Sequence, residues 1–265
     1  MFPRRIFQTW KTHNVPKHWQ SYQDSWKRNH SDWLYVLQND EENRNFILTH
    51  FHSCIDVYDQ LPFNINRVDF VRYAYLYVHG GVYADMDCES IKSLEPLLCS
   101  LEKKKEISIV LSYDSLAHLE CAFMISKPRQ KFWLKVMDSI RDGLTCPAST
   151  LQFYSYVSSS MYILHLTGPC RLELMVKQQQ QPDGIKIFPS DYFFPKQWND
   201  TKHVQGKDIA TTNTYVVHHM TGSWISSYEK VGFEMVKFIS TLQWGWYLLL
   251  LVVIVMFIII LRNFF

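Results

Sequence analysis

The residues best suited to chemistry in this sequence are the acidic pair Asp85 and Asp87. They follow Val82-Tyr83-Ala84, which we expect to form a short strand. In an extended chain, residues i and i+2 point the same way, so both carboxylates can face one small cation at the end of that strand. Two carboxylates with few other protein ligands suit Mg²⁺ or Mn²⁺, whose remaining ligands are waters and phosphate oxygens. The spacing therefore predicts a divalent-cation site.

Two other interpretations of Asp-x-Asp are a solvated acidic turn and a calcium-binding EF-hand loop. An EF-hand loop beginning at Asp85 would have Ser90 where glycine is needed and Pro96 where a bidentate glutamate is needed, so it fails. A solvated turn is the commoner origin of an isolated Asp-x-Asp. The choice between a turn and a metal site therefore depends on the elements around the pair.

The stretch before the pair predicts a helix that ends in two glycines. An apolar stripe recurs there at helical spacing, formed by Val68, Val71, Tyr75 and Val78. Asp69 and Arg72 are three residues apart and share a different face of this helix. Gly80 and Gly81 can adopt positive φ and end it.

This stretch resembles a known group of enzymes, in which a helix, two glycines, a strand and an acidic pair follow one another in the same order. The group is the DXD-containing nucleotide-sugar glycosyltransferases typified by the yeast initiating α-1,6-mannosyltransferase. It includes the inositolphosphoceramide mannosyltransferases, and the large clostridial glucosylating toxins are more distant relatives. The residues that match its pattern here are Asp69, Arg72, Tyr73, Leu76, Gly80, Gly81, Tyr83, Asp85 and Asp87.

Shorter motifs extend the resemblance to Trp224. Gln8-Thr9-Trp10 follows the first expected strand as in the family, and Thr167-Gly168-Pro169 matches a family turn. The last family motif is a histidine two to five residues before Ser-Trp, and His218-His219 with Ser223-Trp224 matches it. Strand alternation is expected to send the two histidines to opposite sides.

One expected strand departs from the family pattern. The segment CAFMISKPRQKFW resembles a family strand and the Lys/Arg-Pro-x-x-x-Phe-Trp sequence that continues it. The family often has Asn just before this strand, whereas Glu120 and Cys121 stand there in this chain. The side chain that meets the donor sugar from this strand is therefore left open.

The resemblance implies roles for the matched side chains. It implies a catalytic set of Asp69, Arg72, Asp85 and Asp87. It implies a donor-binding set of Trp10, Asp69, Arg72, Tyr83, Asp85, Ser223 and Trp224. It implies Mn²⁺ or Mg²⁺ ligands drawn from Asp85, Asp87, His218 and His219, with His218 favoured of the two histidines. Relatives retain the anomeric configuration without a clear enzymatic nucleophile, so no covalent residue is assigned.

Composition and element order predict one α/β domain. The chain has 265 residues, 47% of them hydrophobic and 15% aromatic, which is enough for one sizeable core. Expected strands and helices alternate, as in a layered α/β structure with a mostly parallel sheet. With the resemblance, this implies a GT-A-type, Rossmann-like mixed sheet flanked by helices over residues 1–228. The net charge of +2 predicts no nucleic-acid partner, and six cysteines without a CxxC spacing are expected to be free.

The C-terminal end of the sequence predicts a membrane anchor. Residues 244–261 carry no charge and are apolar on every face, and as a helix they would span about 27 Å, close to the hydrocarbon core. Residues 229–243 would connect this span to the catalytic domain, and 262–265 would form a short tail. The alternative is a buried terminal core helix.

A single-pass protein of the Golgi or another endomembrane follows from the span and the resemblance. Lys230 and Lys237 precede the span and Arg262 follows it, which favours a cytosolic catalytic domain. The usual home of the family, the Golgi lumen, favours the other side, so the side stays open. The short connection to the span favours an acceptor presented at the membrane, either a glycan or a sphingolipid-type lipid.

The predicted function is a membrane-anchored, metal-dependent, retaining glycosyltransferase. It would move a hexose from GDP-mannose or a UDP-hexose, and the preference for mannose rests on analogy alone. The alternatives are a catalytically degenerate sugar-binding protein of the same fold and a metal-dependent hydrolase. Intact acidic and basic motif residues argue against the first, and the lack of a dense His/Asp cluster argues against the second.

Overall fold

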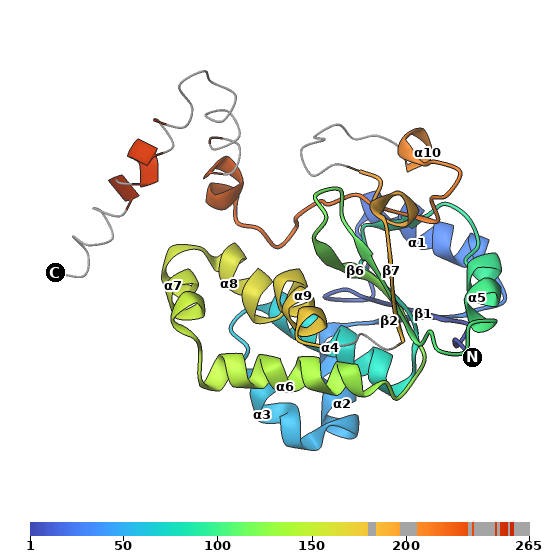
Figure 1. Cartoon of the computed structure of the whole chain (residues 1–265), viewed down its shortest axis with the longest axis horizontal. Helices are drawn as coiled ribbons and strands as arrows, with labels where there is room; N and C mark the ends of the chain where they lie inside the picture. Colours follow the sequence, from blue (N-terminus) through green and yellow to red (C-terminus); the bar gives the residue numbers. More distant parts are fainter. Residues whose placement is uncertain are drawn as a thin grey trace. The chain divides into compact units, whose positions relative to one another are not determined.

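The structure is a computed structural model that describes residues 1–179, 184–196 and 206–232, together with 235, 247, 250–253, 255 and 256. It divides into two compact units, Met1–Thr221 and Gly222–Phe265. The strands and helices named below belong to the first unit (Figure 1). The predicted limit of the catalytic domain at residue 228 stays a prediction.

A six-stranded mixed sheet forms the centre of the first unit, in the order β2-β1-β3-β6-β5-β7. Its strands are β1 (Arg5–Thr9), β2 (Leu34–Gln38), β3 (Gly81–Ala84), β5 (Ile109–Tyr113), β6 (Leu119–Ser126) and β7 (Ile185–Phe188). β1 is parallel to β2 and β3, and β5 is parallel to β7, whereas β6 is antiparallel to both β3 and β5. The predicted α/β class is confirmed, with β6 as the strand that makes the sheet mixed.

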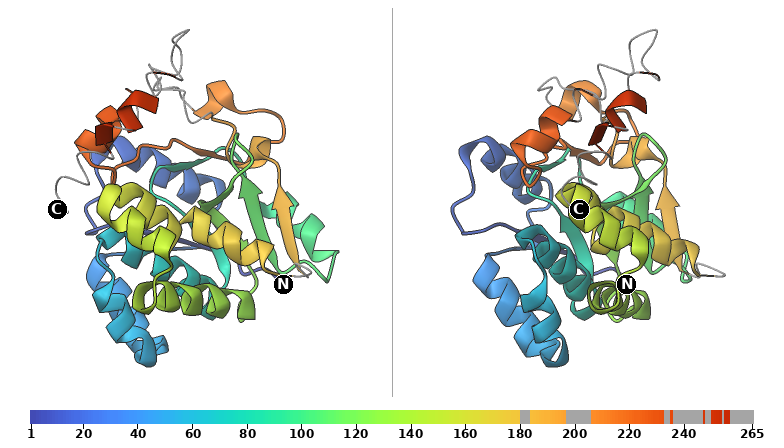
Figure 2. Two further views of the ribbon diagram at one scale, coloured as in Figure 1. Left: turned by 60° about the vertical axis from the view of Figure 1, so that its left-hand side comes forward. Right: turned by 90° about the vertical axis from the view of Figure 1, so that its left-hand side faces the viewer.

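Helices cover both faces of this sheet (Figures 1 and 2). They are α1 (Lys17–Asn29), α2 (Asp40–His50), α3 (Ile55–Gln60), α4 (Asn64–Val78), α5 (Glu95–Glu102), α6 (Lys131–Thr145), α7 (Ser149–Val157), α8 (Ser159–Leu166), α9 (Pro169–Lys177) and the short α10 (Gly206–Ile209). Successive strand side chains point to opposite faces. Phe7 and Tyr83 therefore join the core under α2, α4, α6 and α9, whereas Ile6 and Val82 join the core under α1 and α5.

The central helix α4 is buried on almost every side. Every residue from Asp69 to Leu76 is buried, so the predicted apolar stripe is only part of its packed surface. The helix ends at Val78, and Gly80 and Gly81 follow with φ of +64° and +91°, as predicted. A Cβ on Gly80 would lie 2.7 Å from the carbonyl oxygen of Ser126, so only glycine fits where the chain enters β3.

Two other helix boundaries differ from what the local sequence predicts. The sequence favours Asp40 as the cap of a helix, but the N-cap of α2 is Asn39, because the side chains and backbone N–H groups of Asn39 and Glu42 form a reciprocal capping box. The apolar residues of 152–166 predict one helix, but the structure has two, α7 and α8. Ser158 has an extended backbone between them, and its side chain caps α8.

A second, two-stranded sheet lies beside the main one. It pairs β4 (Cys88–Ser90) with β8 (Val216–His218) in antiparallel register, and Cys88 lies opposite His218. The sequence predicts a late strand over residues 215–219, and β8 confirms that strand. This sheet brings the late part of the chain to the residues that follow the acidic pair.

Most residues of the predicted membrane span, 244–261, and of its connector, 229–243, lie outside the described residues. Within the ranges given above, no helix has the length and apolarity needed to cross a membrane. In the second unit, backbone hydrogen bonds join Ile225 to Gly222 and Lys230 to Ser226.

Candidate active site

Asp85 and Asp87 lie in a tight turn after β3, not in the extended chain predicted for them. β3 ends at Ala84, and the Cys88 N–H donates to the Asp85 carbonyl at 3.0 Å, which closes the turn. The Asp85 N–H donates to the Ala122 carbonyl of β6 at 2.8 Å and ties the turn to the sheet. Because the chain reverses between the acids, the i, i+2 argument fails and the two carboxylates have different partners.

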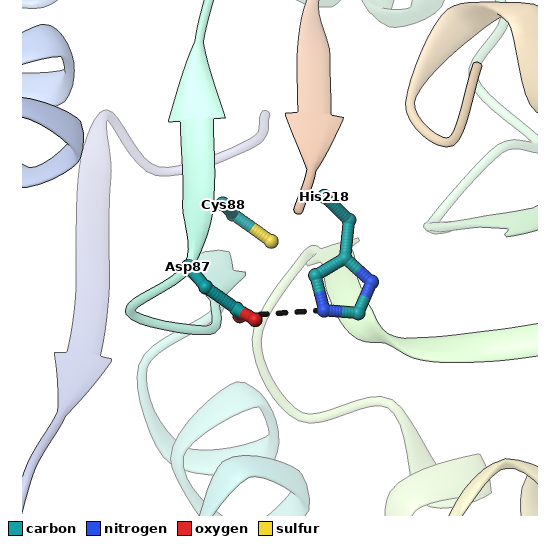
Figure 3. A group of neighbouring side chains, drawn as sticks. All are labelled: Asp87, Cys88 and His218. Carbon is teal, nitrogen blue, oxygen red and sulfur yellow. Dashed lines mark ion pairs between the residues drawn. The ribbon is translucent and has the colours of Figure 1, made fainter. Parts of the chain in front are cut away.

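The Asp87 carboxylate binds residues that follow or end β8 (Figure 3). His218 Nε2 lies 3.3 Å from Asp87 Oδ1. The Thr221 N–H and hydroxyl both donate to Asp87 Oδ2, at 2.9 and 2.8 Å. Met220 has φ of +51°, a left-handed conformation uncommon for a residue with a side chain, at the bend between β8 and Thr221. Both oxygens of Asp87 are thus held by the late motif.

The Asp85 carboxylate binds the buried residues of α4 and β3. Arg72 Nη2 lies 3.2 Å from Asp85 Oδ1, and the Tyr83 hydroxyl donates to the same oxygen. The Arg72 guanidinium lies 4.5 Å from the centre of the Tyr83 ring, a cation–π contact. Arg72 and Tyr83 are 1% and 0% exposed. Tyr83 therefore positions Asp85 and Arg72, and its predicted contact with the donor stays a prediction.

Asp69 completes this network from the same helix. Its Oδ1 lies 2.9 Å from Arg72 Nη2, which confirms that the two side chains share a face. Its Oδ2 accepts a hydrogen bond from the Thr167 hydroxyl at 2.6 Å, and that hydroxyl accepts one from Asn66 Nδ2 at 2.7 Å. Asp69 thus positions Arg72, and its predicted contact with the sugar stays a prediction.

Burial and neighbouring charges separate the pKa values of these acids. Burial raises the pKa of Asp69 to about 6 although Arg72 opposes it, and burial also raises the pKa of Asp85 against the same guanidinium. Burial acts on Asp87 too, but the ion pair with His218 and its hydrogen bonds outweigh it and hold the Asp87 pKa below its usual range. In return, Asp87 raises the pKa of His218 to about 9 despite burial. Asp87 is therefore the most firmly ionised acid of the site.

Glu120 is a further acid near this network. It lies on β6 opposite Ser112 of β5. Burial raises its pKa to about 7, with Asp114 and Asp85 adding to the effect and His218 opposing it. Within the described part of the chain, its carboxylate has no hydrogen-bond or ion-pair partner. The strand that departs from the family pattern thus places a carboxylate in the electrostatic field of the acidic pair.

His218 and His219 serve different networks, as strand alternation predicts. His219 Nε2 lies 3.0 Å from Glu89 Oε2, and its ring stacks on Tyr22 with centres 4.2 Å apart. Only its backbone N–H reaches the acidic turn, where it donates to the Asp87 carbonyl at 3.0 Å. The structure therefore brings the His218 side chain to the acidic turn and holds the His219 side chain against β4 and α1.

Trp10 lies in an aromatic cluster beside the acidic turn. Trp10, Tyr22 and Leu37 pack around the buried Val15, Trp19 and Met86. The rings of Trp10 and Trp19 meet edge-on, with centres 4.5 Å apart. Met86 lies between the two acids in sequence, so the cluster adjoins the turn. This position agrees with the predicted contact between Trp10 and a nucleotide base, because a flat, partly exposed indole suits stacking.

Ser223 and Trp224 belong to the second unit, and their predicted contacts with the diphosphate stay predictions. Thr167 and Thr221 are polar partners of the acids that sequence reasoning did not assign. A signal existed for both, because Thr167 opens the matched turn tripeptide and Thr221 stands between His218-His219 and Ser223-Trp224.

A cavity of about 760 Å³ lies away from this site, among α6, α8 and α9. It is lined by Asp138, His165, Cys170 and Arg171, among others, and by none of the predicted site residues. The Arg171 guanidinium donates to the His165 carbonyl and to the Ser139 hydroxyl, so it is held by the protein itself. The site is therefore defined by the acidic turn and not by this cavity.

The ligand atoms at the acidic turn suit a divalent cation. In the described ranges, Asp87, Cys88 and His218 form the one group of three or more His, Cys, Asp or Glu side chains with ligand atoms all within 4.8 Å of one another. Asp85 is outside this group because its carboxylate is held by Arg72 and Tyr83. An ionised carboxylate and an imidazole are ligands that Mn²⁺ accepts, and carboxylates suit Mg²⁺.

Comparison with known proteins identifies relatives of this chain. Residues 16–104 match the family model described as a glycosyltransferase sugar-binding region containing a DXD motif. Inositol phosphoceramide mannosyltransferase 3 of Schizosaccharomyces pombe is 45% identical over 96 residues, which cover 36% of this chain and 27% of that protein. Mannosyl phosphorylinositol ceramide synthase SUR1 of Saccharomyces cerevisiae is 30% identical over 182 residues, which cover 68% of this chain and 43% of that protein. The chain thus spans less than half the length of each of these two relatives.

Among solved structures, the PaToxG glycosyltransferase is similar to this chain with a TM-score of 0.47 and 15% sequence identity. The similarity covers 68% of this chain and 69% of that one.

Proposed function

Since this chain belongs to the family of glycosyltransferases whose sugar-binding region contains a DXD motif, we propose that it transfers a hexose from a nucleotide sugar in a reaction that depends on Mn²⁺ or Mg²⁺. The observation that carries the proposal is the meeting of two distant motifs at one turn. Asp87 lies 3.3 Å from His218, although 130 residues separate the two in the sequence. The two residues belong to different motifs of the family pattern. This convergence places an ionised carboxylate and an imidazole at one point.

The residues at the turn suit the chemistry of a departing nucleoside diphosphate. Asp85, Asp87 and His218 would hold the cation, which as a Lewis acid stabilises the negative charge that develops on the leaving diphosphate. Arg72 keeps Asp85 in place by charge, and Thr221 keeps Asp87 in place by hydrogen bonds. Trp10 would stack on the base, and retention at the anomeric carbon is expected from the family resemblance.

The names of the relatives support a choice of donor and acceptor. Both relatives described above are named for mannose transfer to an inositol phosphoceramide, which favours GDP-mannose over a UDP-hexose. It also favours a sphingolipid-type acceptor over a membrane-borne glycan. Residues 244–261 would anchor the enzyme in a Golgi or other endomembrane, next to such an acceptor.

Sugar transfer by the full chain in isolated membranes tests the proposal. Radiolabelled GDP-mannose, UDP-glucose and UDP-galactose would be compared with lipid and glycan acceptors, after EDTA and after re-addition of Mn²⁺. We expect one donor to label an acceptor, the label to vanish with EDTA and to return with Mn²⁺. Binding of a nucleotide sugar with neither transfer nor hydrolysis would instead support a degenerate sugar-binding protein.

A further inference from the structure

A cysteine thiol lies against the proposed cation ligands. Cys88 follows Asp87 and stands directly opposite His218 in the antiparallel pair of β4 and β8. Side chains of directly opposed residues lie on the same face of the ribbon with Cβ atoms about 5 Å apart. Figure 3 shows the Cys88 sulfur directed toward the space between Asp87 and His218. One ligand atom from each of the three side chains lies within 4.8 Å of the other two.

The backbone around these three side chains is held firmly. The Trp26 indole N–H donates to the Cys88 carbonyl at 2.8 Å, and the His219 N–H donates to the Asp87 carbonyl at 3.0 Å. Cys88 is 0% exposed, and its thiol donates to the Ala122 carbonyl at 3.5 Å, a weak hydrogen bond because a thiol is a poor donor. The sulfur is therefore positioned by the fold and is bound weakly by its present partner.

A ligand set of one sulfur, one nitrogen and one oxygen atom favours a different metal from the Mg²⁺ or Mn²⁺ that the acidic pair suits. Mg²⁺ and Mn²⁺ favour oxygen ligands, whereas a thiolate and an imidazole favour Zn²⁺ and other thiophilic ions. A zinc site with three protein ligands and one open position is tetrahedral, with metal–ligand distances that place ligand atoms roughly 3.3 to 3.6 Å apart. Asp87 and His218 already have a spacing of 3.3 Å. The sulfur, with its ligand partners no farther than 4.8 Å away, has to come closer to them to complete that set.

We propose that Asp87, Cys88 and His218 form a site for a thiophilic divalent cation, Zn²⁺ or Cd²⁺. Because the site shares Asp87 and His218 with the proposed Mn²⁺ or Mg²⁺ site, the two metals exclude each other. Zn²⁺ is then an inhibitor of transfer that competes with Mn²⁺. Metal binding itself is independent of the proposed function, and only the inhibition rests on it.

Titration with Cd²⁺ tests binding without any use of activity. The full chain would carry Cys99→Ser and Cys146→Ser throughout, because both of these thiols are exposed and could bind Cd²⁺ on their own. Thiolate-to-Cd²⁺ charge-transfer absorption would be compared among this background, Cys88→Ala, Cys88→Ser and the matched control Cys170→Ser. We expect saturation at one equivalent in the background and in the control, and loss of the absorption in both Cys88 variants. The affinity for Zn²⁺ should fall at least about tenfold in the Cys88 variants.

Two outcomes would overturn the site. One is a background protein without the absorption, and the other is a Cys88→Ala protein that keeps it. Thermal unfolding checks that the Cys88 variants are folded, and Cys88→Ser is the more conservative replacement if Cys88→Ala does not fold. The proposal would also be rejected if both folded Cys88 variants showed the same Cd²⁺ absorption as the control protein.

Activity then separates this proposal from the proposed function. If transfer is detected, Zn²⁺ should inhibit the background protein competitively against Mn²⁺, and Cys88→Ala should need at least about ten times more Zn²⁺ for the same inhibition. Equal inhibition of the background protein and of Cys88→Ala by Zn²⁺ would show that Zn²⁺ does not compete with Mn²⁺ at this site. A normal Cd²⁺ titration in a protein that transfers no sugar from any donor would reject the proposed function and leave the thiophilic site standing.

Discussion

The acidic turn has two halves that are built differently. The early half consists of Asp69, Arg72, Tyr83 and Asp85. The late half consists of Asp87, His218 and Thr221. The side chains of Asp69 and Arg72 are 4% and 2% exposed, whereas those of Asp85, Asp87 and His218 are 26%, 11% and 13% exposed. Asp69 and Arg72 are thus sealed by the protein, whereas Asp85 borders solvent as the late half does.

The charge partners also differ between the halves. In the early half, one guanidinium lies between two carboxylates, and Arg72 also donates to the Cys121 carbonyl at 2.9 Å. Each half has a buried nitrogen without a hydrogen-bond partner among the described residues, Arg72 Nε in the early half and His218 Nδ1 in the late half. A guanidinium can only donate, whereas an imidazole nitrogen and the neighbouring free Cys88 thiol can bind a cation. The difference supports a positioning role for Asp69 and Arg72, and it supports the proposed cation binding by the late half together with Asp85.

The largest effect is expected from Asp87→Asn. The change keeps the shape of the side chain but removes the charge from the proposed cation site, so transfer should fall by about 10³-fold at saturating Mn²⁺. The fold should survive with a loss of about 1–3 kcal/mol in the free energy of unfolding, because the change weakens the ion pair with His218 and the hydrogen bonds from Thr221. Initial rates of sugar transfer measure the effect, and the matched control is Asp138→Asn, an exposed acid of α6. Near-normal transfer by Asp87→Asn at limiting Mn²⁺ would refute the metal role.

Arg72→Met tests the early half. Removing the guanidinium leaves the buried Asp69 and the partly exposed Asp85 without their counter-charge, so the free energy of unfolding should drop by about 3–5 kcal/mol. The control is Arg141→Met, which breaks an i,i+3 ion pair with Asp138 on the surface of α6 and should cost less than about 1 kcal/mol. Chemical denaturation followed by circular dichroism measures both. Similar losses for the two variants would mean that the early half is no more structural than a surface pair.

His218→Ala and His219→Ala compare a residue of the late half with its neighbour outside both halves. His218→Ala should raise the Mn²⁺ concentration for half-maximal transfer about 10–100-fold, because a ligand is lost. His219→Ala should leave that concentration unchanged and lower the free energy of unfolding by about 1–2 kcal/mol, because Glu89 loses its imidazole partner and keeps the Gly206 N–H. Small, equal effects of the two changes on Mn²⁺ dependence would remove His218 from the site.

Thr221→Val should have the smallest effect. It removes one of the two hydrogen bonds to Asp87 Oδ2 and keeps the backbone one, so Mn²⁺ affinity should weaken about tenfold. Thr49→Val, an exposed change in α2, is the control. A loss as large as that of Asp87→Asn would show that the hydroxyl does more than orient the carboxylate.

Much of the early half could be predicted because its geometry is local. Helical spacing sets Asp69 and Arg72 on one face, and Gly80-Gly81 supplies the positive φ that lets α4 turn directly into β3. The strand of residues 81–84 and the late strand β8 were also predicted with nearly correct limits. These features depend on residues a few positions apart, so local patterns determine them.

The turn at the acidic pair was predicted wrongly for a physical reason. An extended strand through Asp85 and Asp87 agrees with the local sequence, but hydrogen bonds to β6 and within the turn end β3 at Ala84. The Ala122 carbonyl that accepts from Asp85 comes from a strand far along the chain. No local pattern carries that information.

The sequence by itself determined the family motifs, the α/β class and the pairing of Asp69 with Arg72, because each depends on residue identity or on spacing within one element. Only the tertiary structure decided which histidine meets Asp87, that Thr167 holds Asp69, and that Cys88 lies opposite His218. Each of these contacts joins residues about 100 or more positions apart. The contacts of His218 depend on the register of β4 and β8, and the contact of Thr167 depends on the packing of the end of α8 against α4. Strand register depends on long-range hydrogen bonds and on burial of one face of each strand, and both it and helix packing form only when the whole core is assembled.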